Sequence, residues 1–330
     1  MNTCRGADAI VVRMITVPLL MLAFSAAQGE NYPQRPVKMI VPFAAGGVTD
    51  SVGRVVAHYL GARMGQQVVV ENRGGGGGTV GSEAAARSTP DGYTLLFGSA
   101  ESFGLTYPDA KRLNYDPEKD LTPVAMIARA PNVFVVHPTV KAATIKELIE
   151  LARANPGKLR YGSPGVGSNG HIIGEMFKDR FHIDMIHVPY KGGGAGINDV
   201  VSGQIELLIA GSATAAPRIR SGQVRGLAVT GAARLPIIPN VPTMDEAGVS
   251  DFVLGPLFCV FAPAGTPPEV IARLEREIVA LVGSPEFKQR LIDLGAEEVE
   301  PLTGAAFGHY IRAEVQRWRE MAVPAGFKKE

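Results

Sequence analysis

Residues 161–171 read Y-G-S-P-G-V-G-S-N-G-H. A short apolar stretch precedes this run and a helical pattern follows it, which is typical of a turn from a strand into a helix. Gly165, Gly167 and Gly170 match G-x-G-x-x-G, the glycine pattern of dinucleotide-binding turns. The run therefore allows three hypotheses: a nucleotide site, a catalytic loop, or a cradle for another anion.

The order of strand, glycine-rich loop and helix recurs along the chain. The predicted strands are 37–41, 67–71, 93–97, 133–137, 158–161, 185–188, 205–210, 226–230 and 257–262. The predicted helices are 49–64, 79–88, 144–155, one ending near 178, one ending near 202, 213–221, 267–282, 285–294 and 303–320. Alternation with short connections predicts an α/β fold with mostly parallel sheets flanked by helices.

Gly/Ser-rich loops follow several of the predicted strands and open helices. They lie at 44–50, 98–102, 162–170, 191–196 and 211–214. In parallel sheets such loops meet at the carboxyl edge, where ligands bind. Their backbone N–H groups and the helix N-termini attract anions. Two domains that face each other across these edges form a cleft suited to an anion.

Composition and charge predict an ordinary globular protein. The chain has 330 residues, of which 46% are hydrophobic and 20% are charged, and its formal net charge is +1. This length favours two domains, and the apolar content suffices for buried cores. The near-neutral charge indicates no nucleic-acid partner.

The N-terminal segment has the pattern of a secretory signal peptide. Two arginines flank or precede an apolar stretch at 14–24, and small residues at 25–27 suit a cleavage site. The apolar stretch is too short to span a membrane, so we expect a soluble exported protein without residues 1–27. The mature chain then keeps one cysteine, Cys259, whose apolar neighbours indicate a buried side chain rather than a nucleophile.

The nucleotide hypothesis fails on its surroundings. A dinucleotide turn belongs to the first strand–helix unit of its domain, and an acidic residue ends the next strand about 20 residues on. Asp184 has nearly that spacing, but it precedes the predicted strand 185–188. Walker A, H-E-x-x-H and C-x-x-C patterns are absent, and the six histidines form no cluster in the sequence. We therefore expect no nucleotide, no metal and no other cofactor.

The catalytic hypothesis also lacks support. Ser163 and Ser168 each lack one glycine of G-x-S-x-G. His171 and Glu175 share a helix face, which favours a helix-start hydrogen bond and a surface pair over a metal site. A hydrolase that uses Ser163 or Ser168 with His171 also needs a third group to orient the base, and none is visible. We expect no enzymatic activity.

Two charged residues keep alternative roles. Asp50 follows Gly46-Gly47 and either stabilises a helix start through the helix dipole or contacts a ligand hydroxyl, amine or bound water. Lys191 either pairs with an anion or is solvated beside a glycine turn. The sequence leaves both alternatives open.

Short motifs in a fixed order resemble one known family. They are Y-P-x-R-P at 32–36, V-P-F-x-x-G-G-x-x-D at 41–50, V-V-V-E-N-R at 68–73, P-D-G-Y-T-L-L at 90–96, Y-D-P-x-x-D at 115–120, N-P-G-K-L at 155–159, G-S-x-G-x-G-S-x-x-H at 162–171, H-V-P-Y-K-G at 187–192 and A-P-A-G-T-P at 262–267. Behind a signal peptide, this series resembles the Bug-type periplasmic solute-binding proteins of tripartite tricarboxylate transporters. The resemblance covers essentially the whole mature chain.

The resemblance implies a two-lobed Venus flytrap fold with a small carboxylate between the lobes. Lobe 1 comprises 28–129 plus 255–330, and lobe 2 comprises 130–254. The ligand carboxylate is expected to be held largely by backbone N–H groups and ordered water. By position, the first-lobe site residues are Ala45, Gly46, Gly47, Asp50, Ser99 and Ser102, and the second-lobe residues are Ser163, Gly165, Gly167, Ser168, Tyr190 and Lys191.

Three departures from the family pattern bear on the ligand. Ala44-Ala45 stand where a proline usually precedes Gly-Gly, Ala210 or Gly211 stands where an aspartate is frequent, and Leu257 replaces a frequent tryptophan. Each change removes polarity or bulk near the expected cleft. This favours a larger apolar or aromatic carboxylate over an amino acid.

The leading hypothesis is a monomeric periplasmic receptor without chemistry. One lobe captures the carboxylate, the other closes over it by hinge motion, and a two-protein integral membrane permease receives it. The alternative is a sensor domain that reports the carboxylate to a membrane receptor. The sequence does not separate uptake from sensing.

Overall fold

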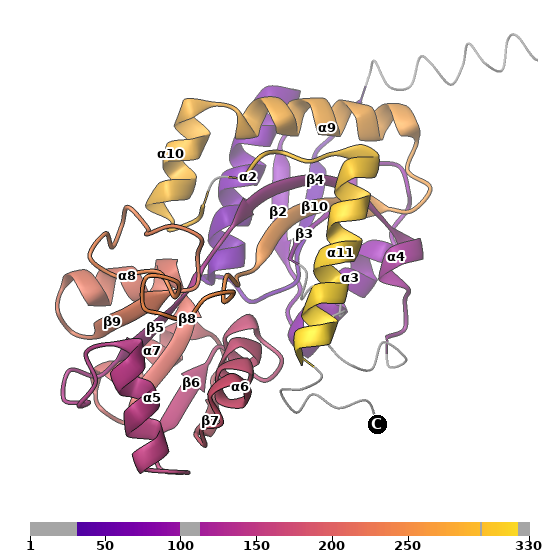
Figure 1. Ribbon diagram of the computed structural model, residues 1–330. Helices are drawn as coiled ribbons and strands as arrows, with labels where there is room; N and C mark the ends of the chain where they lie inside the picture. The colour runs from indigo at the N-terminus through magenta and orange to yellow at the C-terminus, as the bar shows by residue number, and fades with distance from the viewer. Residues whose placement is uncertain (1–31, 100–112, 298, 323–330) are drawn as a thin grey trace, which may run out of the picture.

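The computed structural model describes residues 32–99, 113–297 and 299–322. Over these ranges the chain forms two five-stranded sheets, each flanked by helices, in separate halves of the molecule (Figure 1). The predicted two-lobed α/β fold is thereby confirmed. The signal peptide predicted at 1–27 lies outside the described residues.

The first lobe is the half built on the sheet of order β2-β1-β3-β10-β4. Its elements are β1 (Val37–Val41), α2 (Val48–Met64), β2 (Val68–Asn72), the short 3-10 helix η1 (Gly76–Gly78), α3 (Thr79–Ala86), β3 (Thr94–Gly98), α4 (Pro117–Asp120), β4 (Leu121–Arg129), β10 (Leu257–Pro263), α9 (Pro268–Val282), α10 (Pro285–Asp293) and α11 (Gly304–Ala322). Most of these lie within a few residues of the predicted ranges.

The second lobe is the half built on the sheet of order β7-β6-β8-β5-β9. Its elements are β5 (Asn132–Val136), α5 (Ile145–Ala154), β6 (Arg160–Ser163), α6 (Asn169–Phe181), β7 (Ile186–Pro189), α7 (Gly193–Val201), β8 (Leu207–Gly211), α8 (Ser212–Arg220) and β9 (Arg225–Val229). The first-lobe strands lie within 37–129 and 257–263, and the second-lobe strands lie within 132–229. The exact residues at which the lobes divide stay a prediction.

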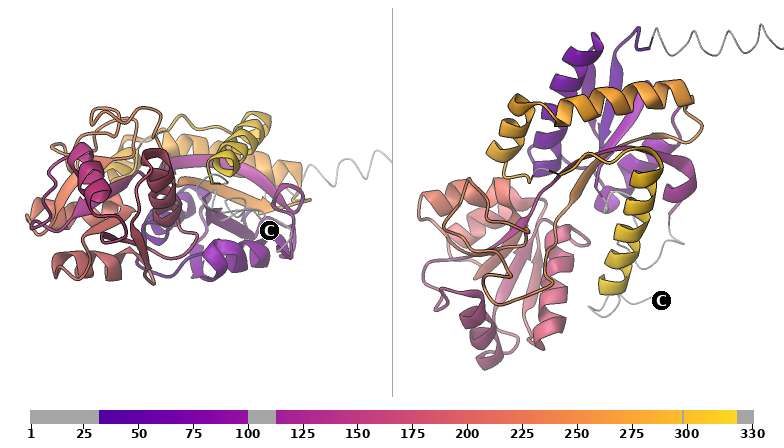
Figure 2. Two further views of the ribbon diagram at one scale, coloured as in Figure 1. Left: turned by 60° about the horizontal axis from the view of Figure 1, so that its bottom comes forward. Right: turned by 45° about the horizontal axis from the view of Figure 1, so that its top comes forward.

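Each sheet contains one strand that runs against the other four. In the first lobe this strand is β10, and in the second it is β5. The chain leaves β4 at Arg129 and starts β5 at Asn132, and it later returns to start β10 at Leu257. A strand that enters a sheet from the edge facing the other lobe must run against strands that end there. The two crossing segments lie next to each other, with Ala130 N donating to Pro256 O at 3.0 Å (Figure 2).

β4 is not predicted by its sequence pattern. Its sequence, L-T-P-V-A-M-I-A-R, contains a proline and shows no clear alternation. β4 lies at the end of the strand order, and proline is tolerated on an edge strand because the missing N–H faces outward. The pairing register with β10 also shifts between Val260 and Phe261, opposite Pro123.

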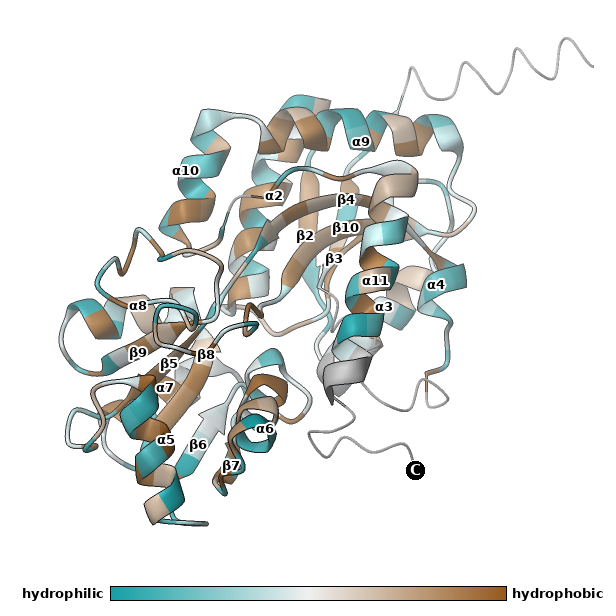
Figure 3. Ribbon diagram, viewed as in Figure 1, coloured by the Kyte–Doolittle hydropathy of each residue, from teal (hydrophilic) through white to brown (hydrophobic). Residues whose placement is uncertain are grey.

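Apolar side chains pack against both faces of each sheet. In the first lobe Phe97 and Phe258 stack at 5.7 Å on the face covered by α2 and α9, and Phe261 packs on the opposite face. In the second lobe Phe134 packs toward α5 and α6, and Leu208 packs toward α7 and α8. Strands buried on both faces are expected to be continuously apolar. Figure 3 shows β10, β5 and β8 largely brown beneath helices whose outer surfaces carry teal residues.

Candidate functional site

The carboxyl ends of the parallel strands in the two lobes face each other. α2 of the first lobe begins at Val48, beside Gly211 at the end of β8: a Cβ on Gly211 would lie 3.4 Å from Val48 Cγ1. α6 begins on the same end of β8, since a Cβ on Gly170 would meet Ile209 O. The structure therefore brings the start of α2 and the start of α6 to one region. The predicted loops of both lobes lie at these helix starts.

The first-lobe loop exposes its backbone. Ala45, Gly46 and Gly47 are exposed between β1 and α2. Gly46 has φ +86°, a conformation that L side chains rarely adopt. Gly47 caps α2 without a side-chain hydrogen bond, and among the described residues the N–H groups of Val48 and Thr49 have no acceptor. These N–H groups at the positive end of a 17-residue helix are suited to an anion.

Asp50 is bound to the protein itself. Its carboxylate is nearly buried, at 5% exposure. Oδ2 accepts from Gly46 N at 2.9 Å and Arg54 Nε at 3.0 Å, and Oδ1 accepts from Asn72 Nδ2 at 2.8 Å. Asn72 Nδ2 also donates to Phe43 O at 3.1 Å. Asp50 and Asn72 together therefore tie down both ends of the 43–46 loop.

The pKa of Asp50 reflects these contacts. Burial alone raises it, but the hydrogen bonds from Arg54, Gly46 and Asn72 outweigh burial and bring it below the ordinary value. Asp50 is thus an ionised carboxylate whose two oxygens are occupied by the loop and its neighbours. In this arrangement it stabilises the loop, and contact with a ligand stays a prediction.

Of the two predicted serines after β3, Ser99 is buried directly behind the strand end. Ser102 lies outside the described residues. The β3 end is adjacent to β1 in the sheet, so Ser99 lies next to the start of the first-lobe loop. The structure thus brings Ser99 together with the 43–47 loop.

The second-lobe loop connects β6 to α6. Gly165 has φ +149°, and a Cβ there would lie 3.2 Å from Tyr190 O. Gly167 N donates to His171 Nδ1 at 3.0 Å, and Ser168 caps α6 by accepting from His171 N. The N–H groups of Asn169 and Gly170 have no acceptor among the described residues, so this helix start is also suited to an anion.

Ser163 is buried beneath this loop. Its side chain has no exposure. The hydroxyl donates to Gly165 O at 3.0 Å and lies 2.7 Å from His187 Nε2. When the hydroxyl donates to Gly165 O, the imidazole supplies the N–H toward Ser163. The side chain thus fixes the loop from below.

Two imidazoles stack behind the loop. The rings of His171 and His187 lie 3.8 Å apart at 13°. Burial, and then the neighbouring His187, lower the pKa of His171 to about 4, and burial also lowers the pKa of His187. The His171 ring is therefore neutral near pH 7, as the bond that its Nδ1 accepts from Gly167 N requires.

The Ser163–His187 pair does not form a catalytic triad. The hydrolase hypothesis paired a serine with His171, whereas the structure places His187 beside Ser163. The carboxylate behind the rings, Glu175, accepts from the Tyr161 hydroxyl and pairs with Lys178. A nucleophile with no exposed surface also has no access to a substrate.

Tyr190 and Lys191 follow β7 at the same edge. Tyr190 N donates to Ser163 O at 3.0 Å, and its hydroxyl donates to Asp199 at 2.8 Å in α7. Burial, followed by the hydrogen bond to Asp199, raises the pKa of Tyr190 to about 12. Lys191 is exposed and takes part in no ion pair among the described residues. Tyr190 is thus held toward α7, whereas Lys191 is available to an anion.

Sequence reasoning missed three residues at the meeting edges: Val48, Ser212 and Asn169. Val48 faces Gly211, and Ser212 Oγ donates to Gly295 O at 2.6 Å across the lobes. Asn169 Oδ1 accepts from Asn132 at 2.6 Å. The sequence flagged their loops as glycine-rich, but the partners come from elements far away in the chain.

The described residues show neither a metal centre nor a membrane span. No three or more His, Cys, Asp or Glu side chains in that part of the chain are grouped so as to hold a metal ion. Among the helices within it, none has both the length and the apolar character needed to cross a bilayer.

Known proteins match this chain over most of its length. A family model described as "Tripartite tricarboxylate transporter family receptor" matches residues 52–326. The chain is 37% identical to Protein BugT of Bordetella pertussis over 302 residues, which cover 91% of this chain and 92% of BugT.

Solved structures agree with this match. The structure of periplasmic binding protein BugD has a TM-score of 0.81 and 35% identity, covering 91% of this chain and 100% of BugD. The structure of R. palustris Rpa4515 with adipate has a TM-score of 0.81 and 34% identity, covering 89% of this chain and 98% of Rpa4515. The similarity therefore includes both lobes and the edges between them.

Proposed function

Because the chain belongs to the tripartite tricarboxylate transporter receptor family, we propose that it captures a small organic carboxylate between its lobes and delivers it to a two-protein integral membrane permease. BugD is a periplasmic binding protein, and Rpa4515 was solved with adipate. The observation that carries the proposal is the pair of facing helix starts. α2 and α6 both present N–H groups that have no acceptor among the described residues to the region where Val48 meets Gly211.

The ligand class is an organic acid without an amino group and with an apolar chain or ring. An ammonium group needs a carboxylate partner, and Asp50 already has both oxygens bonded to the protein. Gly211 brings no charge to the opposite edge, and Val48 presents an apolar side chain to it. Burying an unpaired ammonium there costs more than burying a methylene chain.

A thermal-shift screen of the purified protein tests the proposal. A ligand that binds only the folded state stabilises it by about 2.7 kcal/mol at 100 times its Kd, which raises Tm by several degrees. Matched pairs separate the two parts of the proposal: glutarate against glutamate, and adipate against 2-aminoadipate. We expect a shift with at least one amine-free acid of an apolar chain or aromatic ring, and a much smaller shift with its amino-substituted counterpart.

The outcomes are distinguishable. A larger shift with the amino acids would overturn the ligand class and keep the receptor function. No shift with any mono-, di-, tricarboxylate or aromatic acid would count against carboxylate capture itself. Delivery is tested separately, by loss of uptake of the identified acid when the permease genes are deleted.

A further inference from the structure

Helix α11 packs into the cores of both lobes. Phe307, Ile311 and Val315 lie in the apolar cluster of the first lobe with Leu257 and its neighbours on β10. Trp318, one turn further on and 1% exposed, lies in the cluster of the second lobe with Phe134, Tyr161 and Phe177. Figure 1 shows α11, in yellow, running from beside β4 toward α6. One rigid helix thus spans the boundary between the two cores.

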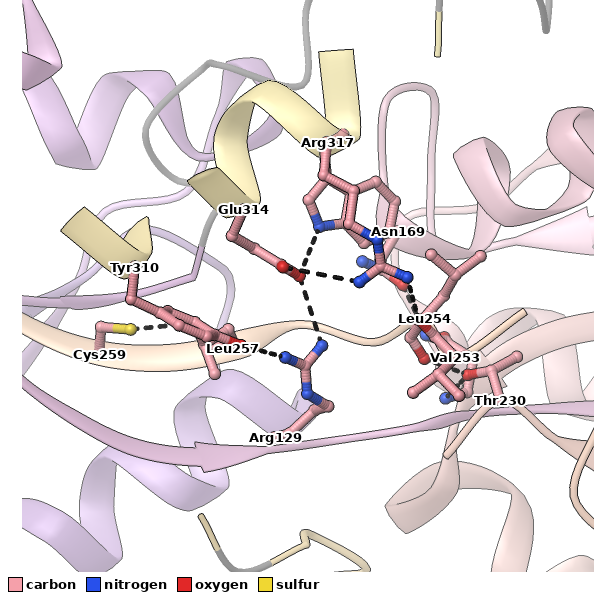
Figure 4. Close-up of polar contacts among 12 residues, drawn as sticks. Arg129, Asn169, Thr230, Val253, Leu254, Leu257, Cys259, Tyr310, Glu314 and Arg317 are labelled. Atoms are coloured by element: carbon pink, nitrogen blue, oxygen red, sulfur yellow. Dashed lines mark hydrogen bonds and ion pairs between the residues drawn. The ribbon is translucent and has the colours of Figure 1, made fainter. Parts of the chain in front are cut away.

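The middle of α11 carries a buried carboxylate that faces a crossing segment. Glu314 is 6% exposed. Its Oε1 lies 3.4 Å from Arg129 Nη1 and accepts from Trp318 Nε1 at 3.2 Å. Arg129 is the last residue of β4, where the chain leaves the first lobe, and its Nη2 donates to Tyr310 Oη at 2.8 Å. Figure 4 shows Arg129, Tyr310 and Glu314 converging between α11 and the crossing strands.

The other crossing segment is bound by the same turn of the helix. Arg317 Nη2 donates to Val253 O at 3.0 Å, and Arg317 Nη1 lies 3.6 Å from Glu314 Oε2. Val253 lies on the returning segment, a few residues before β10 begins at Leu257. Glu314 therefore connects α11 to the outgoing segment directly, at Arg129. It connects α11 to the returning segment through Arg317, which binds Val253 O.

The crossing segments are also tied to the second-lobe loop. Thr230 Oγ1 accepts from Asn132 N at 2.9 Å and donates to Leu254 O. Asn132 Nδ2 donates to Asn169 Oδ1 at 2.6 Å, at the first residue of α6. A movement of the crossing segments is therefore transmitted through Asn132 to Asn169, at the helix start where we propose that the carboxylate binds.

We propose that Glu314 and Trp318 are positioning residues that hold the angle between the lobes in the ligand-free protein. Lobe rotation in hinged proteins is absorbed by a few residues of the connecting segments. Here α11 binds both connecting segments, and its side chains up to Val315 are buried in one core while Trp318 is buried in the other. Rotation must break the bond from Arg317, which Glu314 holds in place, to Val253 O, or withdraw Trp318 from the second-lobe core. The inference goes beyond carboxylate capture and does not depend on the ligand.

Distance measurement between spin labels tests this in the ligand-free protein. Cysteines at two exposed helix positions, Glu150 in α5 and Ala280 in α9, carry one label in each lobe. Cys259 has no exposed surface and stays unlabelled, and Cys4 lies in the predicted signal peptide. Glu314→Gln keeps the side-chain shape and removes the charge. Trp318→Phe keeps an aromatic ring, though a smaller one, and removes the indole N–H.

We expect a second interlobe distance in both variants. Loss of a hydrogen bond to a charged group changes an equilibrium constant by about tenfold or more, so the ratio of the two arrangements shifts by about that factor. Trp318→Phe keeps an aromatic ring in the second-lobe core and provides the readout if Glu314→Gln does not fold. One unchanged distance in the folded variants would overturn the proposal.

Glu277→Gln is the matched control. Glu277 is another buried glutamate with arginine partners, Arg63 at 3.1 Å and Arg273 at 3.3 Å, but these residues lie on α2 and α9, away from the connecting segments and the second-lobe core. This variant is expected to lose stability and keep the wild-type distance distribution. An equal broadening in Glu277→Gln and Glu314→Gln would show a general loss of stability and would refute a specific role for the α11 contacts.

Discussion

Substitution of Asp50 by asparagine tests how the first-lobe loop is held. The Asp50 carboxylate has four contacts: Gly46 N and Arg54 Nε on Oδ2, and Asn72 Nδ2 and Arg54 Nη2 on Oδ1. The amide nitrogen that replaces one oxygen cannot accept, so two of the four contacts are lost. If it replaces Oδ1, the Asn72 amide must turn over, and its bond to Phe43 O is lost as well.

The expected cost follows from these contacts. A hydrogen bond to a charged group contributes about 1.5–3 kcal/mol. Arg54 is 53% exposed, so its share is reduced to about 0–1 kcal/mol. We therefore expect Asp50→Asn to lower the free energy of unfolding by about 2 kcal/mol at pH 7, measured by urea denaturation of the ligand-free protein.

The pH dependence gives a second check. The pKa of Asp50 lies below its ordinary value in the folded protein, so the unfolded chain binds the proton more readily. The contribution of Asp50 to stability is present above about pH 4 and is lost as the pH falls through the folded-state pKa. The stability difference between wild type and Asp50→Asn is expected to shrink below about pH 4.

Asn72→Ala separates loop positioning from ligand contact. It removes the tether on Phe43 O from the other side and leaves the Asp50 carboxylate in place. If Asp50 acts through the loop, both variants weaken binding of the identified acid to a similar degree. Weakening by Asp50→Asn alone, with a stability loss below about 0.5 kcal/mol, would refute our reasoning and indicate direct ligand contact.

Three further predictions concern the second lobe. Gly174→Ala places a Cβ 2.3 Å from Tyr161 Cε2, and urea unfolding is expected to show a loss of about 1–3 kcal/mol from overpacking; an unchanged midpoint would contradict this. The pKa of His171 is lowered to about 4, so the unfolded state binds more protons than the folded state between pH 4 and about 6.5. The free energy of unfolding therefore falls as the pH drops through this window. His171→Asn is expected to flatten this pH dependence, and an equal slope in variant and wild type would disprove it. Gly211→Asp adds a carboxylate beside Val48. It is expected to weaken binding of an amine-free organic acid at least tenfold by calorimetry, since like charges repel in a poorly hydrated cleft and the ligand has no ammonium group to pair with the new carboxylate. Unchanged affinity would place the ligand elsewhere.

Much of the candidate site follows from local sequence pattern. Residues 161–171 form the end of β6, a glycine loop and the start of α6, as their pattern predicts. The helix starts with open N–H groups are local features, because they need only a strand end, a glycine turn and a helical repeat. The missed β4 shows the limit, since its proline suits a strand only when that strand lies at a sheet edge.

The order of strands, glycine loops and helices, apart from β4 and the short helices η1 and α4, and the family motifs were determined by the sequence alone. Tertiary structure decided the partners: Asn72 for Asp50, His187 rather than His171 for Ser163, and the second-lobe core for Trp318. The physical reason is that periodicity and turn chemistry act over a few residues. Partners across the fold depend on sheet order and on how the chain crosses between the lobes, which no short stretch contains.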